Sequence, residues 1–186
     1  MKVLIACEFS GTVRDAFAAQ GHDAVSCDFK KSLTPGQHYQ GDVRDILSDR
    51  FDLLIAFPPC TDFSYAGAQY FSEKIKSGQM AKSILFVQSL FDCSISRKCI
   101  ENPRGLMWKF FGRPSQIIQP YHFGHPYRKY TGLWLRNLRP LMHTSIMAER
   151  QSWVNLYTPG LSRSDHRSLT FKGIASAMAA QWGNIT

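Results

Sequence analysis

This sequence of 186 residues lacks the features that mark membrane, secreted and repeat proteins. It contains no apolar run near the roughly 20 residues that a membrane-spanning helix requires. The N-terminal stretch MKVLIACEFS is interrupted by Glu8 too early for a signal peptide. Internal repeats and low-complexity segments are also missing. We therefore expect a cytoplasmic protein without membrane association, folded as one domain over residues 1–186.

The cysteine and histidine patterns of disulfide frameworks and zinc sites are missing as well. Five cysteines form an odd set without a CxxC pair, and six histidines show no HxH or HExxH spacing. Such a distribution favours neither a disulfide framework nor a metal site, and we predict no metal. Cys7, Cys27 and Cys99 lie in or at the end of apolar runs, which is typical of core residues.

Acidic residues are fewer than basic residues. Lys and Arg together number 22 and Asp and Glu number 14, so the formal net charge is +8. This excess favours a polyanionic partner. The basic residues are scattered along the chain, however, and such scatter is also typical of an ordinary solvated face. The hydrophobic share of 44% and the charged share of 19% are those of a soluble globular protein.

Short apolar runs alternate with helical patterns along the chain. Buried strands are predicted over 2–7, 23–28, 51–56 and 98–102. Helical spacing of apolar residues occurs over 12–20 and 81–91, and again over 170–182 near the end of the chain. This alternation predicts an α/β fold with a mostly parallel sheet.

A tight turn with one glycine, Phe9-Ser10-Gly11, follows the first predicted strand and leads into the first predicted helix. Glycine lets a ligand approach the backbone, and a helix N-terminus offers unpaired amide donors. A full dinucleotide fingerprint needs two further glycines, which are absent where Thr12 and Val13 follow. One glycine alone therefore does not define a dinucleotide site.

Two acidic residues follow at positions that suit a nucleoside. Asp28 closes the second predicted strand 17 residues beyond Gly11, and an acidic side chain about 20 residues after such a turn commonly binds ribose hydroxyls. The neighbouring Phe29 either stacks on a nucleobase or belongs to the core. Asp42 stands before a predicted helix, where it is either an N-cap or a ligand-binding residue.

The stretch FDLLIAFPPCTDFSYAG, residues 51–67, combines a buried strand with an abrupt end. Two consecutive prolines remove two backbone donors, so Cys60 lies at or just past the carboxyl end of the strand, where open α/β sheets bind ligands. Glu101 ends another predicted strand and shares that edge if the strands are parallel. From these residues alone, Cys60 is either structural or reactive. Glu101 either reaches water or an arginine, or faces a ligand as a proton donor with a raised pKa.

Two further segments are polar and aromatic. Residues 61–79 predict a long loop, and loops of that length are usually functional or disordered. Residues 104–140 interleave aromatic and basic side chains around two predicted strands, QIIQPYHFG and YTGLWLRN. This pattern suits a nucleic-acid surface, with cations for phosphates and rings for unstacked bases, and it suits a packed small core equally well.

Taken in order, the motifs of the chain resemble those of DNA (cytosine-5)-methyltransferases, especially short members from phage genomes. Pro59-Cys60 with Phe63-Ser64 and Gly67 is similar to the nucleophile motif PCxxFSxxG of that family. Glu101-Asn102 resembles the start of its ENV motif. The resemblance implies that Cys60 adds to C6 of cytosine and that Glu101 is the acid at N3. It also implies DNA as the partner.

The same resemblance implies S-adenosylmethionine as cofactor and a Rossmann-like methyltransferase fold with helices on both faces of the sheet. The FSG turn, the pair Asp28-Phe29 and the pair Asp42-Val43 look like the family's three cofactor motifs. The stretch GHPYRKYTGLWLRN is loosely similar to its basic motif, which implies that Arg128 stabilises the pyrimidine. The implied cofactor-binding residues are Phe9, Ser10, Gly11, Asp28, Phe29, Asp42, Val43, Phe57 and Pro58.

Such chemistry sets requirements for the nucleophile and for the nearby loop. A free cysteine is only a few per cent thiolate at neutral pH, so we expect positive groups or a helix N-terminus to depress the Cys60 pKa. A base in duplex DNA must be flipped out of the stack, at a cost of a few kcal/mol, and we expect the loop over 61–79 to close over it.

The chain departs from the family pattern in several places. The later glycines of the first motif are missing, Thr61 replaces the usual Gln, and Pro103 replaces Val of the ENV motif. About 40 residues separate the basic motif from the terminal helix, which leaves little room for a target-recognition domain. We therefore expect methylation of cytosine C5 in DNA with relaxed specificity. The alternatives are the same chemistry on a free pyrimidine nucleotide or single strand, and a catalytically silent nucleic-acid-binding protein. The oligomeric state does not follow from the sequence.

Overall fold

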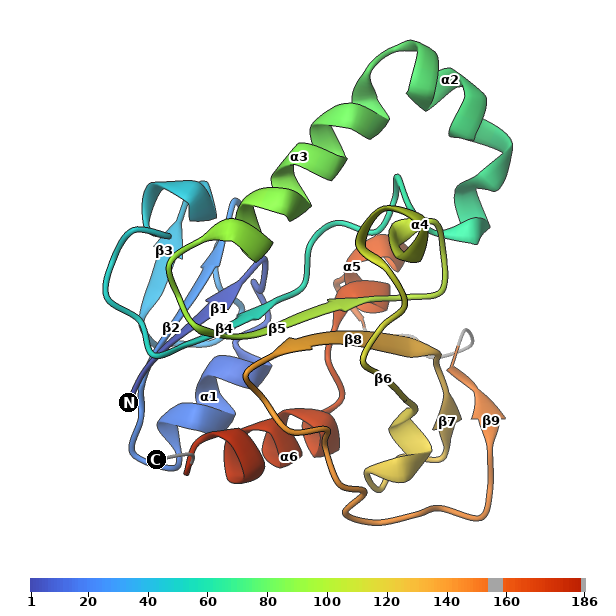
Figure 1. Cartoon of the computed structure of the whole chain (residues 1–186). Coiled ribbons are helices and arrows are strands. Elements are labelled where there is room, and N and C mark those ends of the chain that lie inside the picture. Colours follow the sequence, from blue (N-terminus) through green and yellow to red (C-terminus); the bar gives the residue numbers. More distant parts are fainter. Residues whose placement is uncertain (154–158, 185–186) are drawn as a thin grey trace.

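A computed structural model describes residues 1–153 and 159–184 (Figure 1). Its centre is a seven-stranded sheet in the order β3-β2-β1-β4-β5-β8-β6, and a second sheet pairs β7 with β9. The strands of the large sheet are β1 (Lys2–Ala6), β2 (Asp23–Asp28), β3 (His38–Gln40), β4 (Leu53–Ala56), β5 (Arg97–Asn102), β6 (Gln116–Ile118) and β8 (Thr131–Arg136). Those of the small sheet are β7 (Tyr127–Arg128) and β9 (Gln151–Ser152).

The first five strands of the large sheet are parallel to one another, and β8 is antiparallel to both β5 and β6. The chain first builds outward from β1 through β2 to β3, and then returns to place β4 on the other side of β1. The strand order therefore reverses between β1 and β4. In open α/β sheets this switch point opens a crevice at the carboxyl ends of the strands.

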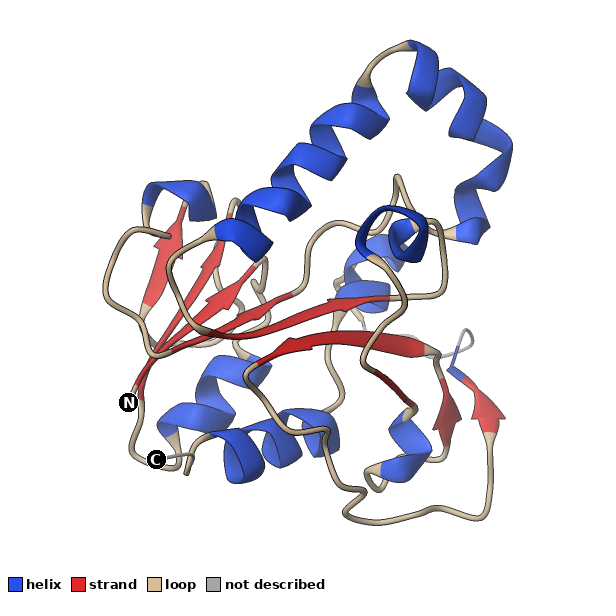
Figure 2. Ribbon diagram, viewed as in Figure 1, coloured by secondary structure: helices blue, strands red, loops and turns tan. Residues whose placement is uncertain are grey.

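Helices cover both faces of the sheet, as Figure 2 shows. The α-helices are α1 (Thr12–Ala18), α2 (Phe71–Lys76), α3 (Gln79–Asp92), α4 (Met107–Phe111), α5 (Arg163–Ser168) and α6 (Lys172–Trp182). The 3-10 helices are η1 (Val43–Asp45), η2 (Tyr65–Tyr70) and η3 (Pro120–His122). Within the described residues, no helix combines the length and apolar character that crossing a membrane requires.

The core consists of two apolar layers, one on each face of the sheet. Val3 and Ile5 of β1 pack with residues of α1 and α6, whereas Leu4 and Ala6 pack with residues of α3, α4 and η1. Successive side chains of a strand point to opposite faces, so a strand of unbroken apolar residues requires cover on both sides. The predicted fold class is confirmed: a Rossmann-like α/β fold with a mostly parallel sheet and helices on both faces.

The segment predicted as a long loop over 61–79 is largely helical. It contains η2 and α2, and α3 begins at Gln79. The buried carboxylate of Asp62 explains this order, because it forms an ion pair with Lys74 at 2.8 Å and accepts hydrogen bonds from Gln79 and Ser83. Burial alone would raise the pKa of Asp62, but these three partners together lower it. In Figure 1, α2 and the start of α3 project from the body of the molecule.

Of the two strands predicted in the aromatic and basic segment, the first is shorter in the structure than expected and the second is observed. The strand QIIQPYHFG is reduced to β6, because Pro120 begins η3. The strand YTGLWLRN is observed as β8. The basic stretch between them carries the short strand β7, which pairs with β9 outside the large sheet. Residues 154–158, between β9 and α5, lie outside the described residues.

Candidate active site and cofactor cavity

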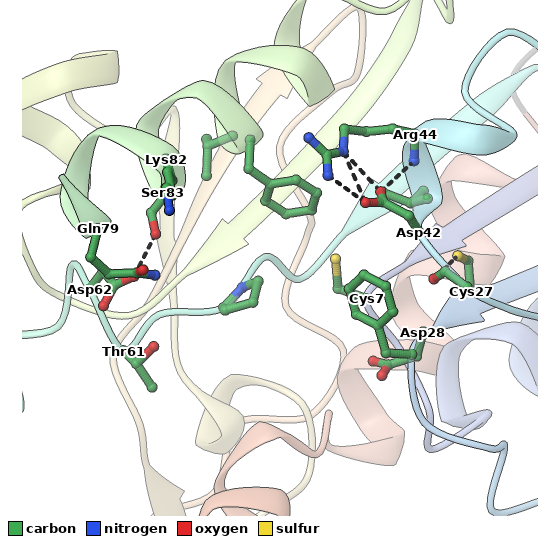
Figure 3. Close-up of a pocket in the computed structure, with 16 residues that line it drawn as sticks. Cys7, Cys27, Asp28, Asp42, Arg44, Thr61, Asp62, Gln79, Lys82 and Ser83 are labelled. Atoms are coloured by element: carbon green, nitrogen blue, oxygen red, sulfur yellow. Dashed lines mark hydrogen bonds and ion pairs between the residues drawn. The ribbon is translucent and has the colours of Figure 1, made fainter. Parts of the chain in front are cut away.

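A cavity of about 470 Å³ lies at the switch point of the sheet (Figure 3). Cys7 follows β1, Cys27 and Asp28 end β2, and Pro59 follows β4, and all four line it together with side chains of α3. Its volume falls within the range of roughly 300–1,000 Å³ that is usual for small-molecule sites. The cavity therefore occupies the place where an open α/β sheet binds a ligand.

Four of the predicted cofactor residues line this cavity: Asp28, Phe29, Asp42 and Val43. The Phe29 side chain is 71% exposed, so its ring is available to stack on a ligand. Asp42 caps η1 and also forms an ion pair with Arg44, and this hydrogen bonding lowers the Asp42 pKa. An exposed ring beside two carboxylates suits the adenine and ribose of a nucleoside.

The glycine turn is built around a buried carboxylate. Glu8 accepts hydrogen bonds from the backbone amides of Val13 at 2.7 Å and Arg14 at 3.3 Å, and from Ser10 Oγ at 2.9 Å. The first amides of α1 are thus satisfied from within the chain. Burial raises the pKa of Glu8, and these hydrogen bonds oppose the rise. A dinucleotide site uses such amides for a phosphate, so this turn suits a ligand without one.

Phe9, Ser10 and Gly11 are buried and are not among the described residues that line the cavity. Gly11 has a φ of 76°, and a side chain there would meet Thr34 Oγ1 at 2.1 Å. The backbone amide of Leu33 donates to the Phe9 carbonyl at 2.8 Å. The segment after β2 therefore covers the turn that the sequence placed beside the cofactor.

Phe57 and Pro58 also lie outside the cavity. Phe57 packs against the core on the α1 and α6 side and lines a second, small cavity of about 20 Å³ together with Glu101 and Lys129. Pro58 is buried, and its carbonyl accepts a hydrogen bond of 3.1 Å from Asn102 Nδ2. These two residues therefore link β4 to Pro59, which lines the large cavity, and to Cys60.

Cys60 and Glu101 lie within electrostatic range of each other. Cys60 follows β4, and Glu101 lies near the end of β5. Because these two strands are neighbours and parallel, both residues lie at the same edge of the sheet. Burial raises the pKa of the Cys60 thiol, Glu101 raises it further, and Lys129 and Arg167 oppose this. The expectation of a depressed Cys60 pKa is therefore wrong for the protein alone, because desolvation outweighs the nearby cations.

Glu101 is protonated more readily than an ordinary glutamate. Burial raises its pKa, and Lys129 partly opposes this. A raised pKa favours the protonated form of a carboxyl group, and that form can donate a proton to a ligand. Glu101 is therefore a candidate general acid.

The cation near this pair is Lys129 and not its neighbour. Arg128 is exposed on β7, whereas Lys129 Nζ donates to the carbonyls of Arg167 at 3.0 Å and Leu169 at 3.4 Å. Burial lowers the Lys129 pKa, while Glu101 and Cys60 raise it. Successive side chains of extended backbone point to opposite sides, so the sequence could have indicated that only one of Arg128 and Lys129 reaches the site.

Asn102 is a second residue that the sequence reasoning did not assign. Its side chain is 0% exposed, and its amide nitrogen holds the Pro58 carbonyl. Its Oδ1 atom is buried without a hydrogen-bond partner in the part of the chain that the structure describes. Because Pro58 and Pro59 have no N–H groups, this side-chain contact is a means of fixing the turn before Cys60. The sequence could have indicated Asn102, because it directly follows Glu101.

The sequence predicts no metal site, and the structure can be searched for one only among the described residues. Across 1–153 and 159–184, no group of three or more His, Cys, Asp or Glu side chains is arranged to hold a metal ion. All five cysteines are free thiols.

Comparisons with known proteins add little to this description. No family model matches the chain, and no curated protein matches it. A similar solved structure is that of an E. coli prophage-encoded protein described as a candidate DNA modification methyltransferase, with 16% identity and a TM-score of 0.49. The match covers 79% of this chain and 52% of the other, so the chain spans about half the length of that protein. At this level of similarity, both fold and function rest on the strand order and the site.

Proposed function

We propose that the protein transfers a methyl group from S-adenosylmethionine to C5 of cytosine in DNA, through a covalent adduct with Cys60. The observation that carries the proposal is that Cys60 and Glu101 lie at the same edge of two neighbouring parallel strands, and that Cys60 directly follows Pro59, which lines the cavity of about 470 Å³. A nucleophile and a protonated acid that act on one substrate must lie close together.

The residues of the cavity fit the cofactor. Asp28 and Asp42 offer carboxylates for ribose hydroxyls and the adenine amine, and the exposed Phe29 ring offers a stacking surface. The Glu8 carboxylate accepts hydrogen bonds from two amides of α1, which disfavours a phosphate at that turn. When bound, S-adenosylmethionine supplies an electrophilic methyl group.

Cys60 and Glu101 then activate the cytosine ring. The Cys60 thiolate forms a bond to C6 while Glu101 donates its proton to N3, so that the ring electrons become available at C5. After C5 has gained the methyl group, loss of the C5 proton to solvent breaks the bond between Cys60 and C6 and restores the ring. Glu101 recovers its proton from N3 in that step.

DNA is the proposed substrate because the chain carries a net charge of +8 and basic residues near the catalytic pair. Lys129 and Arg167 both oppose the rise of the Cys60 pKa, and Arg128 is exposed on the strand β7. An exposed arginine there suits a phosphate contact better than the pyrimidine contact that the sequence suggested. Relaxed sequence specificity remains part of the proposal.

A transfer assay with tritiated S-adenosylmethionine tests the proposal on duplex DNA, single-stranded DNA and dCMP. Label in DNA that is recovered as 5-methylcytosine is the expected result. Label confined to dCMP or to the single strand would change the substrate, and label on another base position would overturn the chemistry. Bound DNA without label would indicate a catalytically silent binding protein.

The covalent step has its own test. DNA containing 5-fluorocytosine cannot lose a proton from C5, so the wild-type protein should remain attached to it in denaturing gels when the cofactor is present. Cys60→Ser should form no such adduct, whereas Cys93→Ser, which alters another partly exposed thiol, should form it normally. An adduct that survives in Cys60→Ser would exclude Cys60 as the nucleophile.

A further inference from the structure

Lys129 is held in place by backbone carbonyls. Its Nζ atom donates to the carbonyls of Arg167 and Leu169, which lie at the carboxyl end of α5. The rings of Trp153 and Phe171 lie 4.8 Å and 5.9 Å from the same nitrogen. Carbonyl oxygens and aromatic faces both stabilise a cation without neutralising it. The position of this ammonium group is therefore set by the 167–171 segment.

The ammonium group lies next to the candidate acid, because Lys129 and Glu101 line the same small cavity of about 20 Å³. Both Glu101 and Cys60 raise the Lys129 pKa electrostatically. Among the ion pairs formed by the described residues, none includes Lys129. A lysine has three N–H donors, and two carbonyls accept two of them. One donor therefore remains for the catalytic pair or its substrate.

A cation is needed at this point because two acidic groups share a partly buried site. Cys60 and Glu101 each disfavour the charged form of the other, and desolvation adds to the cost of either charge. A positive charge that is fixed in advance stabilises whichever of the two is ionised during the reaction. It also needs no rearrangement at that moment, which is the advantage of a preorganised site.

We propose that Lys129 is a positioning residue of the catalytic pair, and that its ammonium group, anchored on the carbonyls of Arg167 and Leu169, balances the charge of the Cys60 thiolate. This inference deepens the proposed function, because it assigns the cation at the site that Cys60 and Glu101 form. It also gives α5 a role, since the end of that helix holds the cation beside the nucleophile.

The test measures the Cys60 thiol directly, in the full chain and without DNA or cofactor. Alkylation of Cys60 by iodoacetamide is followed by peptide mass spectrometry from pH 6 to pH 11 in the wild type, Lys129→Gln and Lys129→Arg. Lys76→Gln removes one positive charge from an exposed position on α2 and serves as the matched control.

The expected result is an upward shift of the Cys60 midpoint by about one pH unit in Lys129→Gln, and so roughly tenfold slower alkylation below the midpoint. Lys129→Arg retains the charge and should restore most of the rate, and Lys76→Gln should match the wild type. A folded Lys129→Gln protein with an unchanged midpoint would overturn the proposal.

A second measurement needs no substitution at Lys129. NMR of ¹³C-labelled lysine follows the titration of the Lys129 amine in the wild type and in Glu101→Gln. Because Glu101 raises the Lys129 pKa, the midpoint should fall in that variant, and an unchanged midpoint would also overturn the proposal. Neither measurement depends on methyl transfer. A protein that shows both shifts but no transfer would refute the proposed function and leave the role of Lys129 intact.

Discussion

The pKa shifts in the large cavity and at the candidate catalytic pair, Cys60 and Glu101, run in opposite directions with respect to charge. In the cavity, the carboxylate of Asp42 is paired with Arg44 and its pKa is lowered, so it stays ionised. At the catalytic pair, the pKa values of Cys60 and Glu101 are raised and that of Lys129 is lowered, so burial shifts all three toward their neutral forms. The first region maintains charges for recognition. The second holds protons that can be moved, which is common at active sites.

The two regions also differ in how the chain assembles them. The polar and aromatic cavity residues Asp28, Phe29 and Asp42 lie close together in sequence after the first strands of the sheet, although Pro59 and side chains of α3 complete the lining. Cys60, Glu101 and Lys129 come from three separate segments, and α5 contributes the carbonyls that hold Lys129. A recognition site can therefore be local, whereas this group of titratable residues depends on long-range packing. Variants that affect one region and spare the other test this division.

The largest expected effect is that of Cys60→Ser. A serine hydroxyl is a far weaker nucleophile than a thiolate, so transfer should fall at least about a thousandfold. The dissociation constant of S-adenosylmethionine, measured by calorimetry, should change less than about twofold, because the cavity is intact. A loss of S-adenosylmethionine affinity as large as the loss of transfer would contradict the separation of the two regions.

Glu101→Gln should lower the transfer rate by about a hundredfold or more, within the usual range for loss of a general acid. The acid must be protonated, so wild-type activity should decline as pH rises through the raised Glu101 pKa. The thiolate requirement of Cys60 acts in the opposite direction, since activity from that group rises with pH. The rate–pH profile of Glu101→Gln should lose the decline at high pH, and a profile of unchanged shape would remove Glu101 from this role.

Phe29→Ala should weaken S-adenosylmethionine binding by about tenfold with little effect on the maximal rate, because it removes a stacking surface. Calorimetry and saturation kinetics measure the two quantities. Leu33→Ala is the matched control, since Leu33 is also exposed, at 52%, on the segment after β2 but does not line the cavity. Equal effects of the two substitutions would argue against adenine stacking on Phe29.

The smallest effect is expected at the Asp62–Lys74 ion pair, which joins the segment after Cys60 to α2. A double-mutant cycle with Asp62→Asn and Lys74→Gln should give a coupling of about 1 kcal/mol in the free energy of unfolding. The Asp62 pKa is lowered in the folded protein, so this contribution is present above the ordinary aspartate pKa and is lost as pH falls through the lowered value. A coupling that persists at pH 2 would not be electrostatic.

Much of the fold could be predicted from the sequence, because the signals are local. Unbroken apolar runs such as residues 2–7 require cover on both faces, and that requirement leads to a parallel sheet between helices. The approach of Cys60 to Glu101 followed from the same reasoning, since parallel strands bring their carboxyl ends to one edge. The helical character of 61–79 could not be predicted, because it depends on contacts that Asp62 makes with Lys74, Gln79 and Ser83.

The remaining details required the packed structure. Sequence spacing placed Gly11 beside the cofactor, but the segment that carries Thr34 folds over the turn. Sequence also suggested Arg128 as the basic residue of the site, but Arg128 is exposed on β7, and the ammonium group of Lys129 instead donates to the Arg167 carbonyl of α5. Which of two adjacent side chains faces a site depends on the direction of the backbone there. That direction is fixed by partners about 40 residues away, which no local pattern records.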